Sequence, residues 1–254
     1  MKLKLLFILL YITSSYSQEI SFSKEDTSIE NIISTLFEGS IDTKTLECVW
    51  RPNISEKLQF GESYNGMLYT IVDTTFFTQL NNKKQFIIAT TTYRKDRNLK
   101  KETCHTCAPS LSIITLEYSP EKDKLLVLEF DKFVTQYGGW GEPQDVTIYS
   151  ISDTSNIVQV NWGSTGQGYT EAGTSFFHNG NLILSILTHE DNEGTTENQS
   201  ERYEYNTSII PNIKNNTLTF NKTGTQRIQN GKIIKVNETS IYKFIENRLE
   251  KICK

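Results

Sequence analysis

After Gly39 the chain consists of short apolar runs, rich in Thr, Val, Ile, Tyr and Phe, that are separated by clusters of Gly, Pro, Asn and Asp. Runs of this kind are typical of β-strands and turns. In the clearest run, Ile157 to Trp162, apolar side chains alternate with amides, which places them on opposite faces of a sheet. The other predicted strands are Met67 to Phe77, Gln85 to Tyr93, Leu111 to Tyr118, Lys124 to Phe130, Val146 to Ile151, Thr174 to His178 and Leu182 to Thr188. We therefore expect a mainly β fold of antiparallel hairpins, arranged as a sandwich, a barrel or a propeller-like structure.

One segment has helical spacing instead, and we expect a short helix from about Ser28 to Glu38. Thr27 and Glu30 fit a capping box at its start, and Gly39 can adopt the left-handed conformation that ends a helix. The apolar face consists of Ile29, Ile32, Ile33, Leu36 and Phe37.

Two tight turns are predicted from local sequence. Asn179-Gly180 supplies the positive φ angles of a two-residue hairpin turn. The segment from Ser240 to Ile252 fits either a helix or a hairpin that turns at Glu246-Asn247, and its β-rich surroundings favour the hairpin. Thr217 to Phe220 and Lys232 to Val236 are further strand candidates.

Residues 1–17 have the order of a secretory signal peptide: a basic start, the apolar run Leu5 to Ile12, and small residues before a cut ahead of Gln18. The apolar run has eight residues, whereas a membrane-spanning helix needs roughly 20. We therefore expect an exported protein, secreted or periplasmic, without stable membrane insertion.

Residues 18–254 are predicted to form a single β-rich domain. The segment from Glu190 to Arg202 has no aliphatic or aromatic residue, so we expect a mobile surface loop at about 190–202. Alternatively, this segment precedes a small C-terminal subdomain, 203–254.

The formal net charge of −4 disfavours a nucleic-acid partner, because phosphate binding depends on clustered Lys and Arg. Five cations between Arg94 and Lys101 are the exception, and we interpret them as a solvated loop.

Four cysteines, Cys48, Cys104, Cys107 and Cys253, favour disulfides in an exported protein. Three complete pairings exist, of which Cys104 with Cys107 and Cys48 with Cys253 is the most economical. Cys104 and Cys107 also match a Cys-x-x-Cys thiol oxidoreductase site, but the context is not a βαβ unit. Neither a haem attachment motif nor a second metal-ligand pair is present, so we predict no cofactor and no metal.

Two glycine-rich stretches carry large aromatics, Trp140, Trp162 and Tyr169. These side chains either stack on sugars or peptides from flexible turns, or pack inward while the glycines permit tight turns. They are the candidate binding residues.

Acidic residues offer an alternative chemistry, since glycoside cleavage uses paired carboxylates at a defined separation. The candidates are Glu117, Glu129, Asp131, Glu142 and Asp145.

Three motifs together resemble those of uncharacterised exported bacterial β-rich proteins with a Cys-His-x-Cys-Ala-Pro segment. They are Cys104-His105-Thr106-Cys107-Ala108-Pro109, Gly139-Trp140-Gly141 and Gly166-Gln167-Gly168-Tyr169. The resemblance implies export and β architecture but no activity.

The sequence therefore favours a non-catalytic binding protein whose ligand is a glycan or a protein. A hydrolase with paired carboxylates and a thiol oxidoreductase are the alternatives.

Overall fold

The computed structural model describes residues 20–58, 60, 66–96, 98, 100–102, 108–136, 145–152, 155–166, 169–192, 202–228 and 232–253. The fold is mainly β, as predicted. Its strands are β1 (Ser21–Ser23), β2 (Ser40–Ile41), β3 (Cys48–Trp50), β4 (Leu68–Leu80), β5 (Lys83–Arg94), β6 (Ser110–Ser119), β7 (Lys124–Gln136), β8 (Asp145–Ser152), β9 (Ser155–Gly166), β10 (Tyr169–His178), β11 (Asn181–Asp191), β12 (Tyr203–Asn212), β13 (Thr217–Arg227), β14 (Ile233–Ile245) and β15 (Arg248–Cys253). The helices are α1 (Ile29–Leu36) and α2 (Ile54–Leu58), with 3₁₀ turns η1 (Lys24–Asp26) and η3 (Ile213–Asn215).

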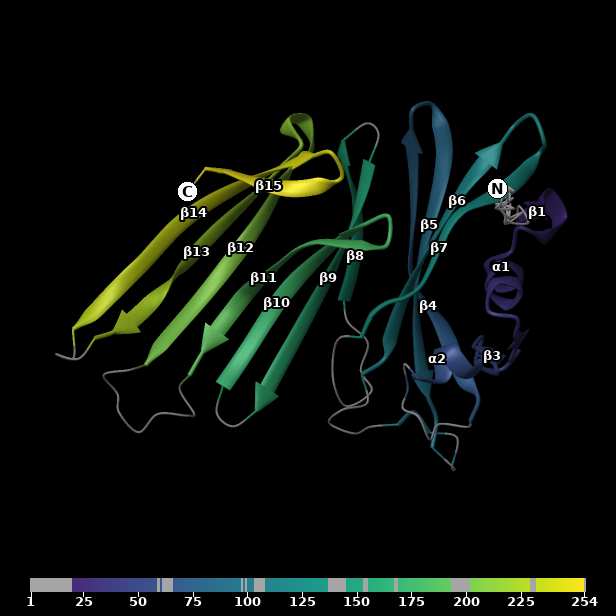
Figure 1. Ribbon diagram of the computed structural model, residues 1–254, viewed down its shortest axis with the longest axis horizontal. Coiled ribbons are helices and arrows are strands. Elements are labelled where there is room, and N and C mark those ends of the chain that lie inside the picture. Colours follow the sequence, from purple (N-terminus) through teal and green to yellow (C-terminus); the bar gives the residue numbers. More distant parts are fainter. Residues whose placement is uncertain are drawn as a thin grey trace, which may run out of the picture.

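The first half of the chain forms a seven-stranded antiparallel sheet in the order β1-β7-β6-β5-β4-β3-β2. This sheet curves around α1, whose apolar face fills its concave side (Figure 1). The helix contributes Ile32, Ile33 and Leu36 to a core that includes the fully buried Ile88 of β5. Aromatic rings complete this core, because Phe37 packs against both Trp50 and Phe130. The helix and the sheet therefore bury each other's apolar faces.

The second half forms an eight-stranded antiparallel sheet in which β8 to β15 follow one another in chain order. Such a meander needs only short hairpin connections between neighbouring strands. Its last strand, β15, contacts β11, and η3 contacts β8, so one end of this sheet curls over. Phe176, Phe220 and Tyr242 pack together inside that curl. Residues 203–253 thus continue the same sheet.

The two sheets pack against each other through a separate apolar cluster. Ile87 and Ile113 of the first sheet meet Val158, Val160 and Phe177 of the second. Successive residues of β5 therefore serve two cores, since Ile87 faces the second sheet and Ile88 faces α1. This contact layer also forms the floor of a pocket between the sheets.

Both predicted tight turns are confirmed. Asn179 and Gly180 have φ angles of 47° and 65° and join β10 to β11. Glu246 and Asn247 have φ angles of 47° and 67° and join β14 to β15, so the C-terminal segment is a hairpin and not a helix.

The predicted helix exists, but its ends differ from the expectation. Ser28, not Thr27, is the N-cap, and its hydroxyl accepts a hydrogen bond from the Asn31 amide. The left-handed residue at the C-terminus is Glu38, with a φ of 53°. Gly39 is needed for a different reason: a Cβ there would lie 2.7 Å from the Cys48 Sγ atom. The glycine lets the chain pass close to β3.

Several segments were assigned incorrectly from the sequence. Strand β12, which includes Pro211, was not predicted, and Glu190 and Asp191 belong to β11 and not to a loop. The basic segment is not freely solvated, because Arg94 pairs with Glu102 and Lys95 pairs with Glu47. Residues 193–201 and the predicted signal peptide lie outside the described residues.

None of the helices in the part of the chain that the structure describes is long and apolar enough to cross a membrane.

Candidate functional site

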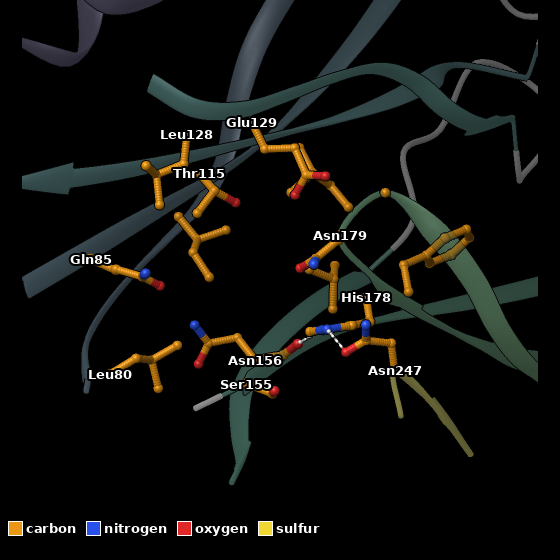
Figure 2. A pocket seen from close by; sticks show the side chains of 15 residues that line it. Leu80, Gln85, Thr115, Leu128, Glu129, Ser155, Asn156, His178, Asn179 and Asn247 are labelled. Carbon is orange, nitrogen blue, oxygen red and sulfur yellow. Dashed lines mark hydrogen bonds between the residues drawn. The ribbon is translucent and has the colours of Figure 1, made fainter. Parts of the chain in front are cut away.

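A pocket of about 390 Å³ lies between the two sheets. Its apolar lining comes from the contact layer, chiefly Ile87, Ile113, Val158 and Phe177. Its polar lining comes from strands of both sheets and from two hairpin turns. These polar residues are Gln85 of β5, Thr115 of β6, Glu129 of β7, Ser155 and Asn156 of β9, His178 of β10, and the turn residues Asn179 and Asn247. Figure 2 shows the side chains of Gln85, Glu129, Asn156 and Asn179 arranged around the same space.

The wall from the first sheet is set by strand register. Thr115 and Glu129 are directly opposite on β6 and β7, so their side chains share the face that points toward the second sheet. Burial raises the pKa of Glu129, and the neighbouring Asp131 raises it further. Burial also raises the pKa of Asp131. The first sheet thus presents a hydroxyl and a carboxyl whose charged form is disfavoured.

A bulge in β7 orients this wall. Residues 132–134 lie opposite a single β6 residue, Ser112, and Phe133 within the bulge has a φ of 60°. A bulky side chain in this left-handed region costs roughly 1–2 kcal/mol. The bulge turns Phe133 toward the helix side, where it stacks on Trp50, while Val134 packs in the layer between the sheets. Bulges of this kind commonly redirect side chains at functional sites.

The wall from the second sheet is held by His178. Its Nδ1 atom lies 2.8 Å from the Asn156 carbonyl oxygen, which can only accept, so Nδ1 carries a hydrogen. Its Nε2 atom lies 3.2 Å from Oδ1 of Asn247 (Figure 2). The ring also packs edge-on against Phe244 at 5.0 Å. His178 therefore connects β9, β10 and the β14–β15 turn beneath the pocket.

Trp162, the predicted aromatic residue whose side chain the structure describes, does not line this pocket. Trp162 packs on its own sheet, because its Nε1 atom donates a hydrogen bond to Ser175. Its ring also covers Gly173, where a Cβ would lie 2.2 Å from the Trp162 Cζ2 atom. Trp140 lies outside the described residues, as does the side chain of Tyr169. For Trp162, the inward-packing interpretation describes the observed contacts.

The predicted Cys48–Cys253 disulfide is not found. Cys48 is a free, fully buried thiol in β3 of the first sheet, whereas Cys253 belongs to β15 of the second. Burial raises the Cys48 pKa to about 11, against the opposing effect of Lys132. The Cys104–Cys107 pair lies outside the described residues.

Among the residues that are described, no three His, Cys, Asp or Glu side chains gather closely enough to hold a metal ion.

The candidate carboxylates have different environments. Glu129 lines the pocket and Asp131 is its neighbour on β7. Glu117 is paired with Lys83 at 2.8 Å, and Asp145 is exposed at the start of β8. Glu142 lies outside the described residues. Glu129 is thus the one carboxylate among the described residues that line the pocket.

Comparison with known proteins does not place this chain in a family. No protein-family model, no curated protein and no solved structure matches this chain.

Most of the pocket residues were not identified from the sequence. Gln85, Thr115 and Asn156 are ordinary sheet residues, and only the packing of two sheets brings them together. The sequence did identify Glu129 as a candidate carboxylate and both hairpin turns as turns, but nothing in it indicated that they face the same space.

Proposed function

We propose that this protein is an exported, non-catalytic binding protein that holds a neutral sugar, free or at the end of a glycan, in the pocket between its sheets. The observation that carries the proposal is the composition of the lining: an apolar floor of Ile87, Ile113 and Val158 beneath a ring of amide, hydroxyl and carboxyl groups. A sugar has the complementary chemistry, since its C–H face is apolar and its hydroxyl edge both donates and accepts hydrogen bonds.

The size and charge of the pocket support this class of ligand. Small-molecule sites usually enclose roughly 300–1,000 Å³ and combine apolar surface with a few oriented polar groups. The described lining contains no Lys or Arg and one carboxylate, Glu129. An acidic sugar would find no cationic partner among these residues, so a neutral one is favoured.

Binding is favoured over hydrolysis by the arrangement of the acids. A glycosidase needs two carboxyl groups on opposite sides of the scissile bond, roughly 5–10 Å apart. Glu129 and Asp131 come from the same strand, and Asp131 does not line the pocket. This arrangement gives a single hydrogen-bonding acid and no partner across the ligand.

A glycan array followed by calorimetric titration of the best saccharide tests the proposal. The double variant Gln85→Met/Thr115→Val keeps side-chain volume but removes two hydrogen-bonding groups, each worth roughly 0.5–1.5 kcal/mol. We expect its affinity to fall about tenfold or more. The matched control, Thr225→Val/Gln226→Met, makes the same changes at exposed positions of β13 and should bind like the wild type.

Two results would contradict the proposal. If no saccharide on the array binds, the ligand class is wrong. If a saccharide binds and the pocket variant retains wild-type affinity, the site is elsewhere.

A further inference from the structure

The β10–β11 hairpin forms one side of the pocket and rests on Asp131, a partly buried acid of β7. Its turn residues Asn179 and Gly180 line the pocket, and a Cβ placed on Gly180 would lie 2.1–2.4 Å from the carboxyl atoms of Asp131. The turn therefore sits directly on this side chain, and the absence of a side chain at residue 180 is what permits the contact.

One oxygen atom of the Asp131 carboxyl has no hydrogen-bond partner to offset its burial. Its Oδ2 atom is shielded from solvent and has no hydrogen-bond partner within the described part of the chain. An ionised carboxylate that is buried without a partner is costly, whereas a protonated one is tolerated.

The groups around Asp131 reinforce the preference for a proton. Opposite it on β6 is Ile113, which carries no charge, and two residues earlier on β7 is Glu129, a second acid. From the second sheet come the uncharged turn residues and His178, which has an oxygen atom close to each ring nitrogen.

We propose that the β10–β11 hairpin is an acid-closed latch on the pocket, which seats on Asp131 when this carboxyl is protonated and lifts when it is ionised. This inference rests on the proposed function for its purpose, because the latch would retain a ligand under acidic conditions and release it as the pH rises. The raised pKa values of Asp131 and Glu129 agree with this direction.

Hydrogen–deuterium exchange of the ligand-free protein tests the latch without reference to any ligand. After correction for the intrinsic exchange rate, protection of the hairpin peptide around residues 176–184 should fall at least tenfold between pH 4 and pH 8. Protection of the β13 peptide, residues 217–227, should stay nearly constant and reports global stability.

Two variants give opposite expectations. Asp131→Asn mimics the protonated acid and should keep the hairpin protected at every pH. Gly180→Ala places a Cβ against Asp131 at a φ of 65° and should leave the hairpin unprotected at every pH. Glu204→Gln, an exposed acid on β12, is the control and should follow the wild-type profile.

The latch is wrong if the Asp131→Asn protein keeps the wild-type pH dependence, or if hairpin protection rises with pH. Failure of the latch and failure of the proposed function give different results. Saccharide binding with a pH-independent hairpin rejects the latch alone, whereas a pH-dependent hairpin in a protein that binds no saccharide rejects the proposed function alone.

Discussion

The two sheets are built from similar strands but are buried to different degrees. The central strands of the seven-stranded sheet are covered on both faces, by α1 on one side and by the second sheet on the other. Strands β12 to β14 of the eight-stranded sheet have one face that carries exposed polar side chains. In one row across these strands, Asn206, Thr223 and Asn237 are directly opposite one another and all are exposed.

The number of faces that a strand buries can be recognised from its pattern of apolar residues. Strand β5 contains the consecutive apolar residues Phe86, Ile87, Ile88 and Ala89, because both faces need apolar side chains. Strand β12 alternates from Tyr203 to Ile210, with Tyr205 and Ile209 less exposed than the residues on either side of them. The same secondary structure therefore makes very different contributions to stability in the two regions.

Truncation of an isoleucine to alanine should lower stability far more in the first sheet than in the second. Ile88→Ala empties a fully buried position between the helix and the sheet, and should lower the free energy of unfolding by about 2–5 kcal/mol. Ile210→Ala, at a position on β12 that is 52% exposed, should change it by about 0.5 kcal/mol or less. Urea denaturation of both variants measures the difference. Equal losses of unfolding free energy in the two variants would show that Ile210 is covered in solution, which would contradict the difference in burial between the two sheets.

A second, intermediate effect concerns a charge in the first sheet. Burial raises the pKa of Asp73 from its ordinary value of 3.8 to about 6, although a hydrogen bond from Thr91 and the charge of Lys101 oppose the shift. The folded state therefore holds the proton more tightly than the unfolded chain. The stabilisation by the bound proton is complete below pH 3.8 and is lost as the pH rises from 3.8 to about 6. Above that range, the buried ionised carboxylate makes the folded protein less stable.

Asp73→Asn removes this cost and should stabilise the protein at pH 8 by about 1–3 kcal/mol, but not at pH 3.5. Asp145→Asn, at an exposed position of β8 in the second sheet, is the matched control and should have little effect at either pH. Thermal unfolding of the three proteins across this pH range gives the comparison. A destabilised Asp73→Asn protein at pH 8 would mean that the ionised carboxylate is favourable where it lies.

The sequence predicted local structure better than it predicted the pocket. The Asn179-Gly180 and Glu246-Asn247 turns were identifiable because positive φ angles restrict the residue type. The helix was identifiable from its apolar spacing, but its cap was placed one residue early because Thr27 and Ser28 carry equally suitable hydroxyls. The strands β1 to β3 are too short to show an alternating pattern. The pocket depends on how two sheets pack, and Gln85 and Asn156 acquire their role only from that packing.

The last prediction concerns the chemical reactivity of the Cys48 thiol and not the stability of the fold. Because Cys48 is fully buried in the helix-side core and its pKa is raised to about 11, little reactive thiolate is present at pH 8. In a protein with Cys104, Cys107 and Cys253 replaced by Ser, native Cys48 should react with iodoacetamide at least about a hundredfold more slowly than after unfolding. A matched protein with Cys48→Ala and Thr225→Cys places the thiol on the exposed face of β13, where native and unfolded rates should be similar. Rapid labelling of native Cys48, or a Cys48–Cys253 crosslink in the unmodified protein, would show that β3 is not buried beneath α1 in solution.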